Sequence, residues 1–229
     1  MFDIHTHVLP FVDDGSKTLE DSLAMLFEAE KQGVTDMVIT PHFRKDYAVL
    51  PQEIKQAFAK LSAAAHDAGV GVKLYVGQEF FINNDFKKDI ADGKMLTIGG
   101  GKAVLIEFDY DLDTDIAEVV YQLKSMGYIP IVAHFERYKY ADISVAEEIK
   151  ALGGYIQINA DGFFGKSKKR YYKKIKELIK NGLVDFVASD VHTFRGNYML
   201  KAYNFVVKKF GEKTAAAVFT ENAKQLING

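Results

Sequence analysis

Two short motifs place pairs of metal-binding side chains on one face of the chain. His5 and His7 form a His-x-His motif, and Asp190 and His192 form an Asp-x-His motif. In an extended strand, residues i and i+2 point to the same side, so each pair can offer two ligand atoms to one ion. A single motif of this kind is a weak signal, because short motifs recur by chance. The pairs predict metal binding only when further ligands join them.

Further metal-binding residues stand where other strands are expected to end. His42, Glu79, Glu107 and His134 each lie at the end of a short apolar run. Five of the six histidines occupy such ends, and His66, in an alanine-rich segment, is the exception without an assigned role. Crowding so many polar groups together is costly unless a cation neutralises them. The sequence therefore predicts a metal centre.

The ligand types indicate which metals suit this centre. Imidazole and carboxylate groups together favour manganese, iron, zinc or magnesium and argue against copper(I) and iron–sulfur clusters. The candidates outnumber what one ion can bind, so two or three bridged ions are expected. Such centres hold the attacking and leaving oxygens of an in-line displacement. Asp14, a further carboxylate near these residues in the sequence, could cap the helix expected from Leu19 rather than bind metal. Taken singly, Glu107 could likewise be a buried structural carboxylate.

Short apolar runs alternate with longer amphipathic segments along the chain. Strands are expected at residues 2–5, 36–40, 72–77, 103–108, 129–133, 155–159 and 185–189. Helices are expected at 19–32, 52–68, 116–126, 145–152 and 167–181, with a helical tail at 197–228 and a polar excursion at 83–101. About seven β-then-α units in one domain, residues 1–229, predict a parallel α/β fold. A TIM-like barrel, whose strand ends form one rim, is favoured over an open doubly wound sheet.

Composition excludes several classes of protein. The 229 residues contain no cysteine, which rules out disulfides, cysteine-bound zinc and a thiolate nucleophile. The 29 basic and 31 acidic residues leave a net charge of −2, so neither nucleic acid nor an acidic membrane surface is an expected partner. No signal peptide or run of roughly 18 apolar residues occurs. We therefore expect a cytoplasmic protein that is not embedded in a membrane.

Seven motifs follow one another along nearly the whole chain. They are His5-Thr6-His7, Asp13-Asp14-Gly15, Thr40-Pro41-His42, Gly77-Gln78-Glu79, Ile106-Glu107-Phe108, Ala133-His134-Phe135-Glu136-Arg137-Tyr138 and Ser189-Asp190-Val191-His192. Together they resemble the PHP (polymerase and histidinol phosphatase) superfamily. More narrowly, they resemble the bacterial manganese-dependent protein-tyrosine phosphatases of capsular and exopolysaccharide gene clusters.

The resemblance implies a distorted seven-stranded TIM-like barrel, the (β/α)7 PHP fold, with a trinuclear manganese centre. The implied metal ligands are His5, His7, Asp14, His42, Glu79, Glu107, His134, Asp190 and His192. Arg137 is implied to contact the substrate phosphate. Arg195 is a candidate second phosphate contact, although it stands nearer the Asp-x-His motif than is usual in the family.

The resemblance also implies a reaction and a partner. A metal-bridged hydroxide would hydrolyse phosphotyrosine on the tail of a bacterial tyrosine kinase, thereby regulating polysaccharide synthesis and export. Three alternatives stay open: a small-molecule PHP phosphoesterase such as histidinol-phosphate phosphatase, a non-catalytic regulator with a vestigial metal site, and an amidohydrolase-type barrel. The third is disfavoured because its pattern lacks the glutamates of strands three and four.

One basic segment lies outside these motifs. Residues 166–180 hold eight basic residues and a single acid, Glu177. Tyr172, Ile175, Leu178 and Ile179 keep a helical apolar stripe there, which favours an ordinary solvated helix face. The other interpretation is a docking patch for an acidic or phosphorylated partner tail.

Overall fold

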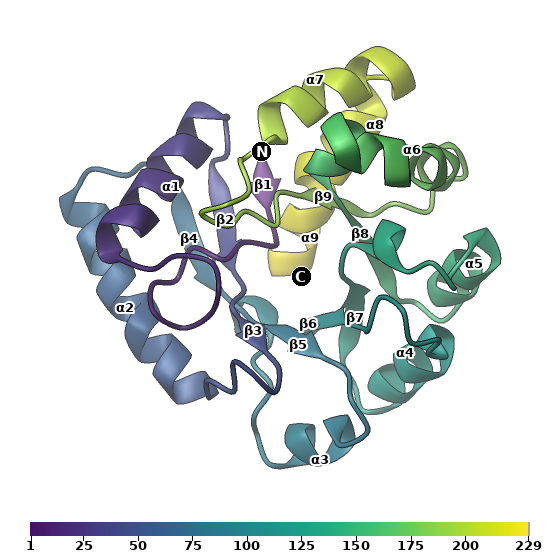
Figure 1. Cartoon of the computed structure of the whole chain (residues 1–229), viewed down its shortest axis with the longest axis horizontal. Helices are drawn as coiled ribbons and strands as arrows, with labels where there is room; N and C mark the ends of the chain where they lie inside the picture. The colour runs from purple at the N-terminus through teal and green to yellow at the C-terminus, as the bar shows by residue number, and fades with distance from the viewer. Residues whose placement is uncertain (229) are drawn as a thin grey trace.

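The computed structural model describes residues 1–228, and its strands all run parallel in a ring with helices outside (Figure 1). The strands are β1 (Phe2–Asp3), β2 (Asp36–Ile39), β3 (His42–Phe43), β4 (Lys73–Val76), β5 (Glu79–Phe81), β6 (Ala103–Glu107), β7 (Ile129–Val132), β8 (Tyr155–Asn159) and β9 (Phe186–Ala188). The α-helices are α1 (Leu19–Lys31), α2 (Pro51–Asp67), α3 (Phe86–Ala91), α4 (Ile116–Ser125), α5 (Ile143–Ala151), α6 (Gly165–Lys180), α7 (Met199–Phe210), α8 (Glu212–Ala216) and α9 (Asn222–Asn228). Short 3-10 turns η1 (Ile98–Gly100), η2 (Phe135–Arg137) and η3 (Ala160–Phe163), and a π-helical turn η4 (Ala217–Glu221), complete the chain.

Two strands are interrupted part-way, which distorts the barrel. β2 and β3 are separated by Thr40 and Pro41, and β4 and β5 by Gly77 and Gln78. Pairing continues across the gaps, because the Glu79 amide donates to the Pro41 carbonyl at 3.0 Å. A β1-β2-β4 sheet thus leads into a β3-β5-β6-β7-β8-β9 sheet. The interrupted pairs form two long strands, so seven strands make up the ring.

The ring closes between its first and last strands. Beyond β1 and β9, the Asp190 amide donates to the His5 carbonyl at 2.9 Å, and the His7 amide donates to the Val191 carbonyl at 3.1 Å. These bonds align the His-x-His and Asp-x-His motifs directly beside each other. The predicted distorted (β/α)7 barrel is confirmed, and the open doubly wound sheet is not found.

Alternating strand residues build two apolar regions. Leu105 and Ile131 belong to a small core that also contains Ile98 and Ala223, whereas Val104, Ile106 and Val132 pack in a larger core with the surrounding helices. Because side chains alternate along a strand, the small core fills the barrel interior. α9 lies near the centre of the ring in Figure 1 and covers one opening. The polar rim occupies the other.

The structure changes several expected boundaries. The excursion at residues 83–101 contains α3 and η1, and the helical tail divides into α7, α8, η4 and α9. The strand continuations β3 and β5 lie beyond the strand ends expected at 40 and 77, because Pro41 and Gly77 interrupt the pattern without ending the pairing. Among residues 1–228, no helix combines the length and the apolar character that a membrane crossing requires.

Candidate metal centre

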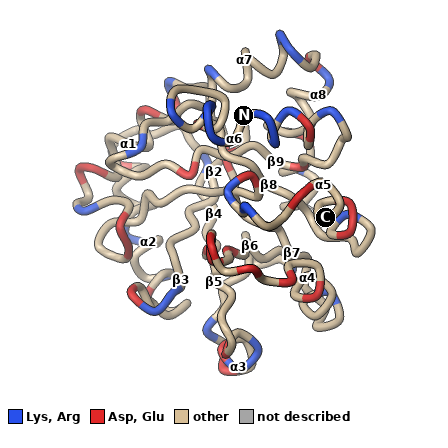
Figure 2. The backbone as a smooth tube through the Cα atoms, turned by 45° about the vertical axis from the view of Figure 1, so that its right-hand side comes forward, with Lys and Arg blue, Asp and Glu red and all other residues tan. Residues whose placement is uncertain are grey.

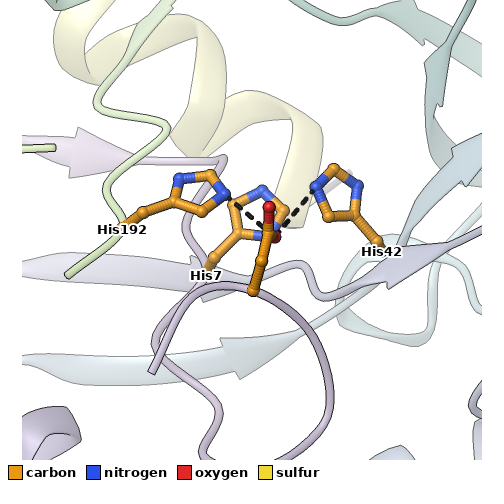
Figure 3. A group of neighbouring side chains, drawn as sticks. His7, His42 and His192 are labelled. Atoms are coloured by element: carbon orange, nitrogen blue, oxygen red, sulfur yellow. Dashed lines mark ion pairs between the residues drawn. The ribbon is translucent and has the colours of Figure 1, made fainter. Parts of the chain in front are cut away.

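All nine residues that the family resemblance implies as ligands gather at the carboxyl ends of the strands. Figure 3 shows the rings of His7, His42 and His192 turned toward one another. His42 Nε2 lies 3.5 Å and His192 Nε2 lies 3.4 Å from Asp14 Oδ1. Eight of the nine are buried, and the Asp14 side chain, at 41% exposure, is the one open to solvent. The rim predicted from strand ends is therefore a real side-chain cluster.

The candidate ligands fall into three overlapping groups, and within each group the ligand atoms lie within 4.8 Å of one another. The groups are His7, Asp14, His42 and His192; His5, His7 and Asp190; and His42, Glu79 and Glu107. His134 joins the third group through Glu79, because its Nε2 lies 2.8 Å from Oε1 of that carboxylate. Burial lowers the pKa of His134 to about 4, despite an opposing contribution from Glu79. The imidazole is thus neutral, which is the form that binds metals.

Several buried atoms in these groups have no hydrogen-bond partner among the described residues. They are Asp14 Oδ1, His42 Nδ1, Glu79 Oε2 and Glu107 Oε2, of which His42 Nδ1 and Glu79 Oε2 lie 2.8 Å apart as an ion pair. Burial and then the neighbouring charge of Glu79 raise the pKa of Glu107 to about 7. Buried polar atoms without partners and adjacent carboxylates are costly, and divalent cations would offset both costs. The donor set fits two or three such ions.

The orientation of His5 and His7 supports the same fit. His5 Nδ1 contacts Gln157 Oε1 at 3.1 Å, and His7 Nδ1 contacts Asp13 Oδ2 at 2.7 Å. When each Nδ1–H donates to these oxygens, both Nε2 atoms present lone pairs, and they lie only 3.0 Å apart. Burial alone would lower the pKa of His7, but Asp13 and Glu79 outweigh burial and raise this pKa to about 10. The pocket therefore favours positive charge between these rings.

Three supporting residues escaped the sequence analysis as participants: Asp13, Gln157 and Asn159. Asp13 holds His7, while Asn159 Nδ2 donates to Asp190 Oδ2 at 2.6 Å and receives a 2.8 Å bond from Gln157 on its own amide oxygen. A signal was available, because Gln157 and Asn159 stand at i and i+2 on an otherwise apolar strand. Residues that hydrogen-bond to metal ligands orient those ligands and tune their affinity for the metal.

The Asp13-Asp14-Gly15 segment packs directly against His7. A Cβ atom at Gly15 would lie 2.0 Å from the carbonyl oxygen of His7, so only glycine fits this approach. The close contact lets Asp13 reach the Nδ1 side of His7 while Asp14 faces His42 and His192.

The backbone is left-handed at two of the candidate ligands. His134 has a φ of 32° and Asp190 has a φ of 48°, and each lies two residues beyond the end of its strand, β7 or β9. For residues other than glycine, such conformations cost about 1–3 kcal/mol and are typical of functional sites. Hydrogen bonds hold both: the His134 amide donates to Gln157 Oε1 at 2.9 Å, and the Asp190 amide donates to the His5 carbonyl.

Both candidate phosphate-binding arginines reach the edge of the centre. Arg137 Nη2 lies 3.1 Å from Asp190 Oδ2, and its Nη1 donates to the Tyr110 hydroxyl at 3.3 Å. Arg195 Nη1 donates to the Asp190 carbonyl at 2.8 Å and also pairs with its carboxylate. A tight turn, in which the Arg195 amide donates to the His192 carbonyl at 3.0 Å, folds Arg195 back. Its short spacing from the motif therefore still brings it to the rim.

Tyr110 lines two of the cavities that open beside the centre. The larger, of about 830 Å³, reaches Glu107 and is walled by Phe43, Phe81 and Phe108. The smaller, of about 440 Å³, contains Arg137 and Arg195 together with residues of α6. Tyr110 donates to Glu107 Oε1 at 2.8 Å and so links the two spaces to the ligand cluster.

Known proteins resemble this chain over its whole length. A family model described as "Capsular polysaccharide synthesis, CpsB/CapC" matches residues 1–228. The tyrosine-protein phosphatase CpsB of Streptococcus agalactiae is 32% identical over 240 residues, covering 99% of this chain and 98% of that protein. The tyrosine-protein phosphatase YwqE of Bacillus subtilis is also 32% identical, covering 99% of this chain and 91% of that protein.

A solved structure agrees with the fold. It comes from work on YwqE from Bacillus subtilis and CpsB from Streptococcus pneumoniae, described as unique metal-dependent tyrosine phosphatases. It superimposes with a TM-score of 0.89 at 29% identity, covering 100% of this chain and 94% of the other.

Proposed function

Because the chain belongs to the CpsB/CapC family of capsular polysaccharide synthesis, we propose that it is a metal-dependent phosphotyrosine-protein phosphatase. Relatives named tyrosine-protein phosphatases over 99% of the chain confirm the enzyme class that the motifs predict. One observation carries the proposal: three overlapping groups of histidines and carboxylates adjoin two arginines at the same rim. This arrangement suits a phosphate ester, which needs cations on one side and planar donors on the other.

The nine candidate ligands would hold two or three divalent ions, of which manganese is the proposed identity, with iron, zinc and magnesium as alternatives. When bound, such ions lower the pKa of coordinated water and neutralise charge on phosphate oxygens. Arg137 and Arg195 would bind the remaining phosphate oxygens with paired N–H groups, an arrangement that lysine cannot reproduce. Asp190 positions both guanidinium groups through its carboxylate.

The larger cavity provides room for the leaving group. Phe81 and Phe108 line it on the way to Glu107, and an aromatic ring can pack against such walls. A tyrosyl oxygen has a pKa near 10, so its departure needs little help from a general acid. The proposed physiological substrate is the tyrosine-phosphorylated tail of a bacterial kinase in the cytoplasm, and its dephosphorylation would regulate polysaccharide synthesis.

The test compares two substrates on purified protein of known metal content. Elemental analysis gives the metals per chain, and turnover of a phosphotyrosine peptide is then measured beside histidinol phosphate, with manganese and with a chelator. We expect manganese-dependent turnover of the peptide. Turnover of histidinol phosphate alone would refute the proposal and favour a small-molecule phosphoesterase.

A further inference from the structure

The smaller cavity joins the arginines of the metal centre to a basic helix. At one side stand Arg137 and Arg195, and at the other stand Ser167, Arg170 and Tyr171 from the first turns of α6. α6 lies beside the ends of β8 and β9, and its blue segments mark a basic run in Figure 2. The cavity thus extends the phosphate-binding edge toward a third guanidinium group.

Among the residues that the structure describes, Arg170 forms no ion pair with an acidic side chain. Arg137 and Arg195 are paired with Asp190, whereas no carboxylate among residues 1–228 lies within 4.0 Å of the Arg170 guanidinium. The same holds for each of the other seven basic side chains between Lys166 and Lys180. Arg170 is solvent-exposed and is therefore available to a binding partner.

Two acidic residues line the same cavity. Asp111 pairs with Lys139, whereas Asp161 accepts a hydrogen bond of 2.8 Å from the Ser167 hydroxyl and keeps its negative charge. Neither carboxylate lies within 4.0 Å of the Arg170 guanidinium. A substrate that carries a second negative group would find an unpaired cation at the far side of the cavity.

The volume of the cavity gives an approximate length to compare with a peptide. A compact space of about 440 Å³ is roughly 8 Å across, which an extended peptide spans in two or three residues. A carboxylate or a second phosphoryl group at this separation from the phosphotyrosine would reach Arg170 while the phosphate is held by Arg137.

We propose that Arg170 is a specificity-determining residue that binds a second negatively charged group of the substrate, two or three residues from the phosphotyrosine. The inference rests on the proposed phosphatase function and deepens it. It gives one part of the basic helix a role that an ordinary solvated face would not have. Lys169, which is exposed on the same helix but lines neither of the two cavities that contain Tyr110, provides the matched control.

The experiment uses the manganese-loaded full chain and three peptides of identical length. Each contains one central phosphotyrosine and differs only at the position two residues away, which is Glu, Gln or a second phosphotyrosine. KM and kcat are measured separately for wild type, Arg170→Gln, Arg170→Lys and Lys169→Gln. A second peptide set varies the residue three positions from the phosphotyrosine. Comparing the two sets shows at which of the two positions the second negative group binds.

We expect wild type to have a KM about two- to fivefold lower for the Glu peptide than for the Gln peptide, as for a partly exposed ion pair. The ratio of KM for the Gln peptide to KM for the Glu peptide should fall to about 1 in Arg170→Gln. It should persist in Lys169→Gln and be partly retained in Arg170→Lys. The doubly phosphorylated peptide distinguishes the two anions, since a dianionic phosphoryl group should give the larger ratio. High salt should reduce every ratio.

Two results would overturn the inference while the proposed function stands. The first is equal KM ratios in wild type and Arg170→Gln at both peptide positions. The second is an equal loss of the KM ratio in Lys169→Gln, which would indicate the general electrostatic field of the basic helix. Absence of turnover with every phosphotyrosine peptide would overturn the proposed function and the inference together. Thermal unfolding of each variant verifies that the exposed substitutions leave the fold intact.

Discussion

Replacing Asp13 with Asn should weaken metal binding, although Asp13 is not among the nine candidate ligands. Its Oδ2 accepts from His7 Nδ1 at 2.7 Å and from the His42 amide at 3.0 Å, and its Oδ1 accepts from the Gly15 amide at 3.0 Å. An asparagine has one oxygen and one NH2 group. Its NH2 group must therefore face either His7 and the His42 amide or the Gly15 amide, and all of these are hydrogen-bond donors. If the NH2 group faces His7, the imidazole must accept at Nδ1 and carry its proton on Nε2, where the ion would bind.

The expected loss follows from the effect of such supporting partners, which is typically 10–100-fold in metal affinity, or about 1.4–2.7 kcal/mol. The assay removes metal with a chelator and titrates manganese back, with activity and bound metal as separate readouts. The metal concentration at half-maximal activity should rise 10–100-fold, while saturating metal restores most of kcat.

Asp67→Asn is the control for this experiment, because Asp67 lies exposed on α2 with a side chain at 83% exposure. Its titration curve should overlay that of wild type. An Asp13→Asn variant whose half-maximal metal concentration lies within twofold of wild type would refute the reasoning that the carboxylate fixes the tautomer of His7.

Three further predictions follow from the same structure. Glu79→Gln should remove at least one bound metal per chain and nearly all turnover, because Glu79 contacts His5, His42 and His134; full metal content by elemental analysis would contradict this. Chelation should lower the melting temperature by about 5–10 °C if the metal was present at 100 times its dissociation constant, since about 2.7 kcal/mol of stabilisation is lost; a change below 1 °C would contradict a structural contribution. Burial lowers the pKa of Lys174 to about 8, so the folded chain binds fewer protons than the unfolded chain between pH 8 and roughly 10.4. The free energy of unfolding should therefore rise with pH in that window, by up to about 3 kcal/mol, and this rise should be absent from Lys174→Met in denaturant titrations at each pH; equal slopes would disprove the assignment.

The ligand positions were accessible from sequence because a parallel barrel exposes one end of every strand. His5 and His134 each follow an apolar run, and that order is local information. Which acid of Asp13-Asp14 faces which histidine was not local, since it depends on the contact between Gly15 and His7. The continuation of strands beyond Pro41 was also hidden, because proline removes a donor but its carbonyl still accepts from Glu79.

Other features required distances between segments far apart in the chain. Gln157 and Asn159 carry no charge, so a search for titratable groups passed over them, yet they connect His5 and His134 with Asp190. Arg195 is explained by a turn whose geometry the sequence does not specify. The basic segment was expected to be helical at residues 167–181, and α6 covers Gly165–Lys180.

Asp190 joins two kinds of binding that are usually measured apart. Its carboxylate lies 3.7 Å from His5 Nε2 and 3.1 Å from Arg137, so it belongs both to a cation-binding group and to the anion-binding edge. A ligand that draws the arginines away from Asp190 changes the negative charge left for the metals. Thermodynamic linkage makes such coupling reciprocal: if manganese strengthens phosphate binding by some factor, phosphate must strengthen manganese binding by the same factor. Product inhibition and metal retention are thus two measurements of one coupling free energy.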